Sequence, residues 1–435
     1  MMRVLPWRHC CAGLAVILTA LTADGTVIGT NPPAQSLTRE RIERLPAPER
    51  GPWLAYLDRS ERQRQADQAS FAAELKHSGI AKPTEPPHGF SARSIPLDRD
   101  AAWYGSAEAR HIADVVVSFQ TPAGGWGKNL NMSGELRHPG ERFGPDNLSR
   151  FLAPGDYDSP LDPNWNYIGT IDNDATTTQL RFLARVVAAF EPREGAPWAA
   201  SFERGITYLL HAQYPDGGWP QVWPLEGGYH DAITYNDDAM TQVVDLLWHT
   251  AEAKDDYAFV PAVLRAQAWA AFERGIHCIL ATQIRENGTL TVWPQQDDPQ
   301  TLQPASARNF EPPAACSSES AAILMVLMND LPHPTAAEKN SIEAAAAWFR
   351  KTAIEGEAWE RMPEGRELVG SPGAGPIWAR FYQIGTDRPI FADRDKTIHD
   401  TVSELSRERR NGYAWYNAEP REALLRFAMW QKEQQ

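Results

Sequence analysis

The sequence predicts a mainly α fold, an α/α toroid in which about three helical hairpins form an incomplete barrel with long loops on one face. The first observation is a repeated phrase: Phe202-Glu203-Arg204-Gly205-Ile206 returns as Phe272-Glu273-Arg274-Gly275-Ile276. Each copy continues through an apolar helical pattern to a glutamine, Gln213 or Gln283. Strand signals are few. Because hairpin repeats bring their turns to one face, a functional site is expected there.

The turns after the repeated helices are rich in glycine and tryptophan. One of them reads Asp216-Gly217-Gly218-Trp219-Pro220, and a more divergent copy upstream reads Gly124-Gly125-Trp126-Gly127-Lys128. A tryptophan in such a turn is typical of sugar stacking and equally of core packing. Trp219 is therefore a candidate substrate-binding residue.

The chain divides into three parts. Residues 1–23 read as a signal peptide, since Arg3 and Arg8 precede an apolar run over 12–20 that is too short to span a membrane. Residues 24–100 form a proline-punctuated extension that is partly helical, with one helix at about 60–76. Residues 101–435 hold the repeats. The protein is expected to be secreted or periplasmic, and monomeric.

Helical periodicity is clear within the third part. It predicts helices over 106–119, 173–190, 199–213, 237–253, 261–282, 317–329, 335–354, 395–408 and 420–432. Long loops separate them, notably 121–170, 214–236, 284–316 and 355–394. Loops of this length in a compact domain are usually functional.

Charge and cysteine content exclude several classes of function. The net charge of −14 argues against nucleic acid as a partner. Cys10 and Cys11 would leave with the signal peptide, whereas Cys278 and Cys316 remain, either as a disulfide or as two buried thiols. No Cys/His spacing typical of a metal site is present.

Two loop-to-helix junctions carry clusters of oxygen ligands. Asp172, Asn173 and Asp174 follow one another in the first, and Asp237 and Asp238 stand together in the second. Helix capping explains one acid at each junction. Carboxylate and amide oxygens in this number suit Ca²⁺, and in a toroid the two junctions could face each other.

Two further loops contribute arginines. Arg308 lies in the rigid segment Ser306–Pro312, and Arg394 lies among aspartates in the segment 385–395. Structural ion pairs explain such arginines as readily as a site does. Together with Lys128 and the aromatic residues, however, the set suits an anionic sugar, because Arg and Lys bind carboxylates and aromatic faces stack on pyranose rings.

In this order the segments resemble the pectate lyases of polysaccharide lyase family ten, over about residues 101–418. The matching pieces are Gly124-Gly125-Trp126-Gly127-Lys128-Asn129, Thr170-Ile171-Asp172-Asn173, the stretch 213–223, the stretch 234–240, Ala307-Arg308 and Asp393-Arg394-Asp395. The resemblance implies an α/α toroid, Ca²⁺ dependence and cleavage of polygalacturonate by β-elimination to 4,5-unsaturated products.

The resemblance also implies roles for individual residues. Asp172 and Asp237 would be calcium ligands, and Arg308 would be the base that removes the C5 proton of the uronate. The predicted substrate-binding residues are Asn173, Lys128, Arg394, Trp219 and Tyr235. Asp174 and the segment Asn309-Phe310-Glu311 depart from the family pattern.

Three other readings of the residues stay open. A glycoside hydrolase would use two opposed carboxylates, such as Asp172 and Asp237. A non-catalytic sugar-binding protein would need the aromatic surfaces but not Arg308. The Gln-Trp repeats also resemble those of triterpene cyclases, although arginines occupy places where an aromatic cavity would be needed.

Overall fold

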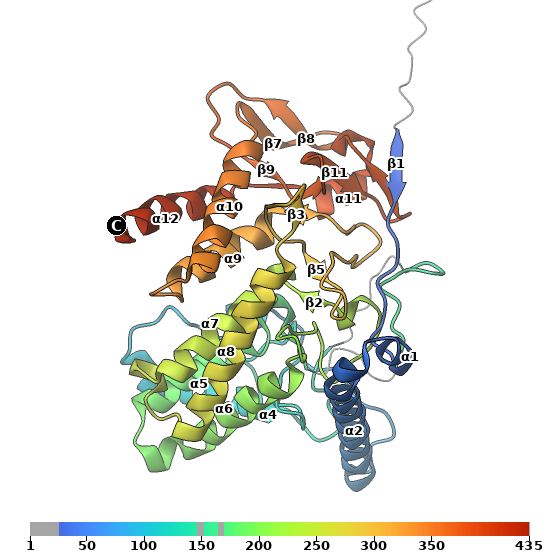
Figure 1. Ribbon diagram of the computed structural model, residues 1–435. Coiled ribbons are helices and arrows are strands. Elements are labelled where there is room, and N and C mark those ends of the chain that lie inside the picture. Colours follow the sequence, from blue (N-terminus) through green and yellow to red (C-terminus); the bar gives the residue numbers. More distant parts are fainter. Residues whose placement is uncertain (1–25, 146–151, 164–168, 435) are drawn as a thin grey trace, which may run out of the picture.

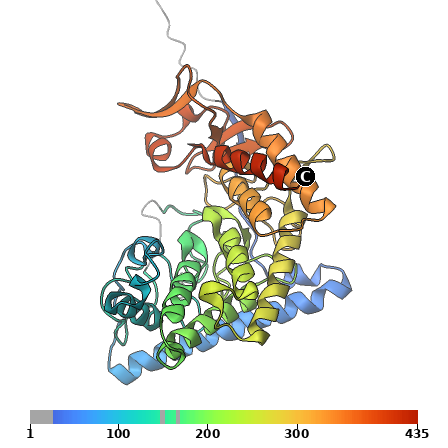
Figure 2. The same ribbon diagram turned by 90° about the vertical axis from the view of Figure 1, so that its left-hand side faces the viewer.

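The computed structural model describes residues 26–145, 152–163 and 169–434, so the predicted signal peptide lies outside the described residues. Helices from the middle of the chain pack side by side in one half of the molecule (Figures 1 and 2). They are α4 (Ala107–Ser118), α5 (Thr177–Ala189), α6 (Pro192–Ala212), α7 (Ala239–Glu252) and α8 (Ala262–Thr282). The helix α5 packs against α6 and α7 against α8, as expected for helical hairpins.

The C-terminal part combines helices with strands. Three helices pack together there: α9 (Ser317–Asn329), α10 (Ala336–Thr352) and α12 (Glu419–Glu433). These three and the five of the first half confirm the helices expected from periodicity. The helix predicted over 395–408 is wrong, because this segment holds strand β12 (Thr397–His399) and only the start of a short helix, α11 (Arg407–Gly412).

The mainly α toroid predicted from the sequence is wrong as a fold class, because sheets form a substantial part of the molecule. A five-stranded sheet has the order β1-β12-β11-β10-β6. Its other members are β1 (Val27–Thr30), β6 (Ala315–Cys316), β10 (Phe381–Gln383) and β11 (Arg388–Ala392). The segment 355–394, expected to be a loop, also forms the hairpin of β7 (Glu357–Met362) and β8 (Gly365–Gly370).

Short strands complete the described architecture. Two pairs lie near the middle of the chain, β2 (Ile233–Thr234) with β5 (Gln296–Asp297) and β3 (Arg285–Glu286) with β4 (Thr289–Leu290). A third pair joins β9 (Trp378–Ala379) and β13 (Tyr416–Asn417). Strands of two residues leave too little alternation to be recognised in a sequence.

The N-terminal extension packs on the rest of the molecule. Its elements after β1 are α1 (Arg39–Glu43), α2 (Ala47–Ser78) and α3 (Ser91–Ser94). The helix expected at about 60–76 is confirmed as part of the longer α2. Tyr56 of α2 is buried and donates a hydrogen bond of 2.9 Å to the carbonyl of Ala212, which fixes the extension to the end of α6.

The repeated glutamines are structural. Gln213 donates from Nε2 to the carbonyls of Gly217 (2.9 Å) and Ala271 (2.8 Å), joining its own turn to the next repeated helix. The two other copies make the same pair of bonds, from Gln120 and from Gln283. All three side chains are buried. The repeat therefore encodes how each helical hairpin is tied to the next.

The two cysteines are free and buried, so the disulfide considered between Cys278 and Cys316 does not form. Among the helices of the described residues, none combines the length and apolar character that crossing a membrane requires.

Replacing Gln213 by leucine tests the structural role of the repeat. Gln213→Leu removes the buried side-chain donor that bonds to the carbonyls of Gly217 and Ala271, so we expect it to lower the free energy of unfolding by about 2–4 kcal/mol. Chemical denaturation followed by circular dichroism measures the loss. The exposed Gln303 serves as a matched control, and Gln303→Leu should change stability little. Equal stability of both variants would contradict the role.

Candidate active site

Two short turns with the same backbone geometry form the floor of the site. One is a 3₁₀ turn over Asp172–Asp174, in which Asn173 has φ 52° and ψ 43°. The other spans Asn236–Asp238, in which Asp237 has φ 50° and ψ 39°. Asn and Asp tolerate this left-handed region better than other non-glycine residues. The turns contact each other, so the two predicted cation-binding junctions do lie together.

The Asp172 carboxylate is buried and paired with a lysine. Lys128 forms an ion pair from Nζ to Asp172 Oδ2, and both side chains are largely buried. Burial acts to raise the pKa of Asp172, but the nearby cations, Lys128 above all, outweigh it and hold this pKa below its ordinary value. Asp172 is therefore ionised at neutral pH.

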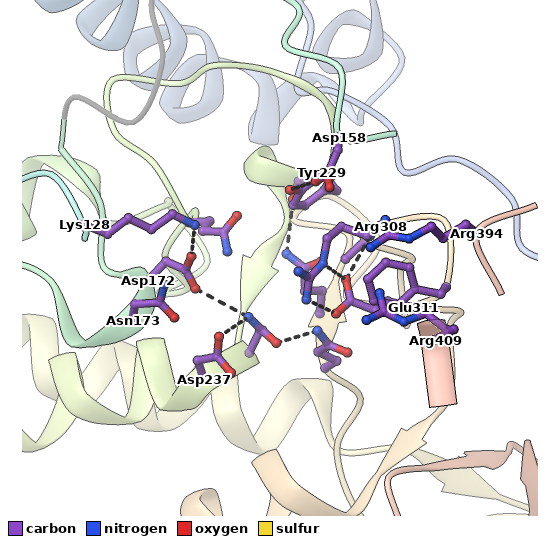
Figure 3. Close-up of a pocket in the computed structure, with 16 residues that line it drawn as sticks. Lys128, Asp158, Asp172, Asn173, Tyr229, Asp237, Arg308, Glu311, Arg394 and Arg409 are labelled. Atoms are coloured by element: carbon purple, nitrogen blue, oxygen red, sulfur yellow. Dashed lines mark hydrogen bonds and ion pairs between the residues drawn. The ribbon is translucent and has the colours of Figure 1, made fainter. Parts of the chain in front are cut away.

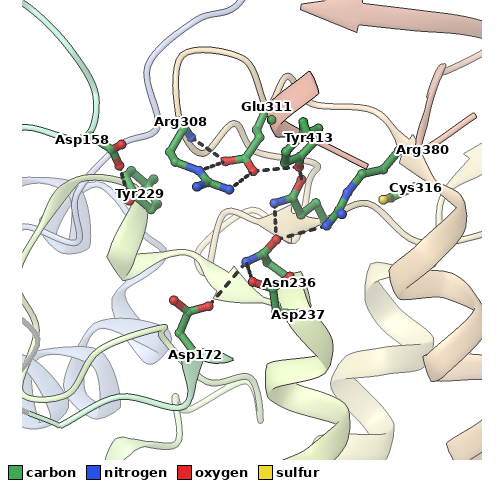
Figure 4. Close-up of polar contacts among 12 residues, drawn as sticks. Asp158, Asp172, Tyr229, Asn236, Asp237, Arg308, Glu311, Cys316, Arg380 and Tyr413 are labelled. Atoms are coloured by element: carbon green, nitrogen blue, oxygen red, sulfur yellow. Dashed lines mark hydrogen bonds and ion pairs between the residues drawn. The ribbon is translucent and has the colours of Figure 1, made fainter. Parts of the chain in front are cut away.

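The second carboxylate, Asp237, is less well compensated. Its hydrogen-bond donor among the described residues is Asn236, whose Nδ2 lies 3.1 Å from Asp237 Oδ2 and 3.5 Å from Asp172 Oδ1 (Figure 4). Although Asp237 is exposed to the cavity, desolvation by the surrounding protein first, and then the negative charge of Asp172, raise its pKa to about 6. A buried acid, Asp172, and an exposed one, Asp237, thus lie next to each other, bridged by the amide of Asn236.

Asn236 is held in place from the opposite side. Its Oδ1 accepts hydrogen bonds from Gln295 Nε2 at 2.6 Å and from Arg380 Nη2 at 3.3 Å. These donors fix the amide so that its Nδ2 points toward the acids.

Arg308 lies across the cavity and is bound to a glutamate. Glu311 accepts from Arg308 Nε at 2.8 Å and from Nη2 at 2.5 Å, and Tyr413 donates to the same carboxylate at 2.8 Å. Burial lowers the pKa of the Arg308 guanidinium, but Glu311 outweighs burial and raises this pKa well above its usual value. The Arg308 side chain is 35% exposed, which leaves it within reach of a ligand.

Two further arginines stand beside Arg308 around one aromatic ring. The guanidinium carbons of Arg409, Arg308 and Arg394 lie 4.0, 4.9 and 5.3 Å from the centre of the Phe310 ring. Arg394 is paired with Glu408 at 2.8 Å. Burial, and after it the positive charges of Arg394 and Arg308, lower the pKa of Arg409 against the opposing effect of Glu408. The cluster concentrates positive charge on one wall.

These groups line a cavity of about 290 Å³, near the lower end of the range for small-ligand sites. Figure 3 shows Lys128, Asp172, Asn173 and Asp237 on one side and the arginines on the other. The charged residues of the lining are Lys128, Arg308, Arg394 and Arg409, opposed by Asp158, Asp172, Asp237 and Glu311. The structure thus brings together six of the eight residues predicted for the site.

The other two, Trp219 and Tyr235, were wrongly predicted to bind substrate. Both are fully buried and neither lines the cavity. Trp219 donates from Nε1 to the carbonyl of Leu209 at 2.8 Å, and the Tyr235 hydroxyl lies 2.7 Å from Thr282 Oγ1. Each ring packs in the core, with its polar atom satisfied inside the protein, so no face is left for a sugar.

Several lining residues were missed by sequence reasoning. Arg409 lies just beyond a segment wrongly expected to be helical, and the run Arg407-Glu408-Arg409-Arg410 was the only signal for it. Asp158 and Tyr229 come from long loops and meet through a 2.7 Å hydrogen bond from the tyrosine hydroxyl. Such a contact depends on the folding of distant loops, which the sequence pattern does not show.

The acids of the floor fit a hard cation. Asp172 and Asp237 present carboxylate oxygens that are close enough to repel, and the amide of Asn173 also lines the cavity. Within the described ranges, no group of three or more His, Cys, Asp or Glu side chains forms a complete cage. A cation held here would therefore need further oxygen ligands from substrate or water.

Comparison with known proteins identifies the family. The model of the pectic acid lyase family matches residues 120–424, well over half of the chain. No curated protein sequence matches it. A family 10 polysaccharide lyase from Cellvibrio cellulosa is similar in structure, with a TM-score of 0.64 and 28% identity over 80% of this chain and 99% of that one.

An aspartate-to-alanine mutant of a family 10 polysaccharide lyase from Cellvibrio cellulosa, in complex with trigalacturonic acid, is also similar. Its TM-score is 0.63, with 29% identity over 78% of this chain and 97% of that chain. The resemblance found in the sequence motifs is therefore confirmed, as is the expectation of a pectate lyase, an enzyme acting on polysaccharides: the protein belongs to the pectic acid lyase family.

Proposed function

We propose that the protein cleaves polygalacturonate by calcium-assisted β-elimination and leaves a 4,5-unsaturated uronate at the new end. The observation that carries this proposal is the cavity in which Asp172 and Asp237 face Arg308, with further cations beside it. The similar lyase bound to trigalacturonic acid supports the choice of substrate. Family membership disfavours the hydrolase, sugar-binding and cyclase readings.

Asp172 and Asp237 would hold the calcium ion. Desolvation first, and then the charge of Asp172, raise the pKa of Asp237, and a divalent cation would relieve this crowding of negative charge. A bound calcium would supply stabilisation for the negative charge that develops on the uronate carboxylate when C5 loses its proton. Lys128 lowers the pKa of Asp172, so this carboxylate would be ionised and able to bind the cation.

Arg308 is the proposed base. Its neutral form takes the C5 proton, the electrons of the C5–H bond form the C4–C5 double bond, and the C4–O bond breaks with its electron pair on the leaving oxygen. Glu311 stabilises the protonated form of Arg308, so the neutral form is scarce at pH 7. Arg394 and Arg409 line the cavity and would bind substrate carboxylates, and Asn173 and Lys128 would complete the substrate contacts.

We also propose that the protein is exported, to the periplasm or the medium, and acts as a monomer. The support for export is the pair of basic residues and the short apolar run within residues 1–23. A polymeric substrate such as pectin is found outside the cell that degrades it, which agrees with export.

The reaction is tested by the ultraviolet absorbance of the unsaturated product. With polygalacturonate at alkaline pH, we expect absorbance to rise in the presence of Ca²⁺ and to stop with EDTA, because charge stabilisation at the uronate carboxylate is lost. New reducing ends without this absorbance would indicate hydrolysis and exclude the proposal.

Asp237→Asn tests the calcium site. Removing one of two carboxylates should raise the Kd for Ca²⁺ about tenfold or more, measured by titration calorimetry. Since the pKa of Asp237 is about 6, wild-type affinity should also weaken as pH falls through 6. The exposed Asp255 gives a control, and Asp255→Asn should bind as the wild type does. Unchanged affinity in Asp237→Asn would count against the site.

The proposed role of Arg308 as base is tested by changing Glu311, which is paired with it. A base is active when deprotonated, so turnover should rise with pH well above 7. Glu311 raises the pKa of Arg308, and Glu311→Gln should therefore lower that pKa and move the rising limb of the pH–rate profile to lower pH. Glu408→Gln, which removes the partner of Arg394 instead, should leave the limb in place. A flat or acidic profile in the wild type would argue against Arg308 as the base.

A further inference from the structure

We infer that Asn31 is a positioning residue for the reaction: its side-chain amide, brought in by the N-terminal extension, holds the turn that carries Arg308 in place. The inference rests on the proposed role of Arg308. Two segments are involved, the N-terminal strap (residues 26–44) and the Arg308 turn (residues 307–311).

The contact is direct. Asn31 Nδ2 donates to the carbonyl of Arg308 at 2.9 Å and to the carbonyl of Asn309 at 3.0 Å. Asn31 is 1% exposed. Both partners are carbonyl oxygens, which only accept hydrogen bonds. The NH₂ group of the Asn31 amide, and not its oxygen, must therefore face them. One buried side chain thus binds the backbone of the residue proposed as base and of its neighbour.

The Arg308 turn is also bonded within itself. Ala307 N donates to the carbonyl of Glu311 at 3.0 Å and Glu311 N to that of Arg308 at 2.9 Å, so the turn is closed on itself. Its Glu311 side chain also binds the guanidinium. These bonds set the shape of the turn. Its position in the cavity is set by contacts to other segments: Tyr413 bonds to Glu311, and Asn31 connects the turn to the sheet.

Asn31 is itself anchored through its backbone. Its N–H donates to the carbonyl of Lys396 at 2.8 Å, and its carbonyl accepts from the Tyr157 hydroxyl at 2.9 Å. The preceding strand β1 pairs with β12, with Thr30 opposite Thr397. The Asn31 side chain therefore projects from a residue that follows the edge strand of a five-stranded sheet, and its backbone is held by hydrogen bonds.

The same network reaches Arg394. Asn309, whose carbonyl is held by Asn31, donates from Nδ2 to the carbonyl of Arg394 at 2.6 Å. Its Oδ1 accepts from the backbone N–H of Tyr157 at 3.0 Å. The next residue along the chain is Asp158, which lines the cavity. Asn31 and Asn309 thus join the segments that carry Arg308, Arg394 and Asp158.

The strap lies outside the residues matched by the family model, which begin at 120. Elsewhere it binds loops around the site: Gly228 N donates to Ser36 Oγ at 2.7 Å, and Arg41 pairs with Asp298 at 2.5 Å. In this protein, a segment that precedes the residues matched by the family model supplies a contact to the proposed base.

Asn31→Ala and Asn31→Asp in the full chain test the inference. Asn31→Asp keeps the size of the side chain and removes the donor, so it separates the hydrogen bonds from packing. Since misplacement of a reacting group by about 1 Å can cost a hundredfold in rate, both variants should lose tenfold or more in kcat with little change in KM. Arg39→Ala, which breaks an exposed ion pair of the same strap, is the control and should keep wild-type kinetics.

Hydrogen exchange followed by mass spectrometry gives a readout independent of turnover. We expect faster exchange at the amides of Ala307, Arg308 and Glu311 in both Asn31 variants, with exchange in α7 and α8 unchanged. This pattern together with the fall in kcat supports the inference. Wild-type turnover in Asn31→Asp, or a fall in kcat without faster exchange of the Arg308 turn, overturns it.

The two proposals fail in different ways. If the wild-type protein produces no unsaturated uronate from polygalacturonate, the proposed function fails whatever Asn31 does, and with it the role of Asn31 in that reaction. If the wild type is active and the Asn31 variants are equally active, only the inference about Asn31 fails.

Discussion

The repulsion between Asp172 and Asp237 is the constraint on which the site depends. Two carboxylates in contacting turns, of which Asp172 is buried and Asp237 opens onto the cavity, are costly unless positive charge lies close to them. Lys128 compensates Asp172, and Asn236 contributes only an amide dipole to the pair. The remaining imbalance appears as the raised pKa of Asp237. The fold tolerates this arrangement because the left-handed turns that create it are fixed by the frame beneath them.

That frame comes from the repeats. Each copy of the repeated glutamine and tryptophan donates its N–H groups to backbone carbonyls, as Gln213 and Trp219 do. The repeated residues thus hold the hairpins together, and the proposed chemistry falls to residues in the turns that follow them, such as Asp172 and Asp237. The tryptophans of the repeat therefore support the turns that carry the proposed site.

The sequence predicted some levels of this structure and not others. Most helices were predictable, because an apolar stripe recurs over many residues, and Asp172 and Asp237 were recognisable because acids crowd helix starts. The five-stranded sheet was not, since its strands are short and β1 pairs with β12 from the opposite end of the chain. Composition alone could not separate the buried ring of Trp219 from an exposed one, and it could not place Arg409 or Asn31 beside Arg308.

The balance of charges in the cavity explains how an acidic protein could bind an acidic polysaccharide. The described cavity lining carries four basic and four acidic side chains, so the protein alone offers a polyanion little net attraction there, and its total charge of −14 opposes approach. A divalent cation between Asp172 and Asp237 would turn this balance positive at one point. The arginines around Phe310 would then orient the carboxylates of the bound polysaccharide, and their contribution to attracting it would be smaller. In the proposed reaction, calcium would therefore control both recognition of the substrate and its chemistry.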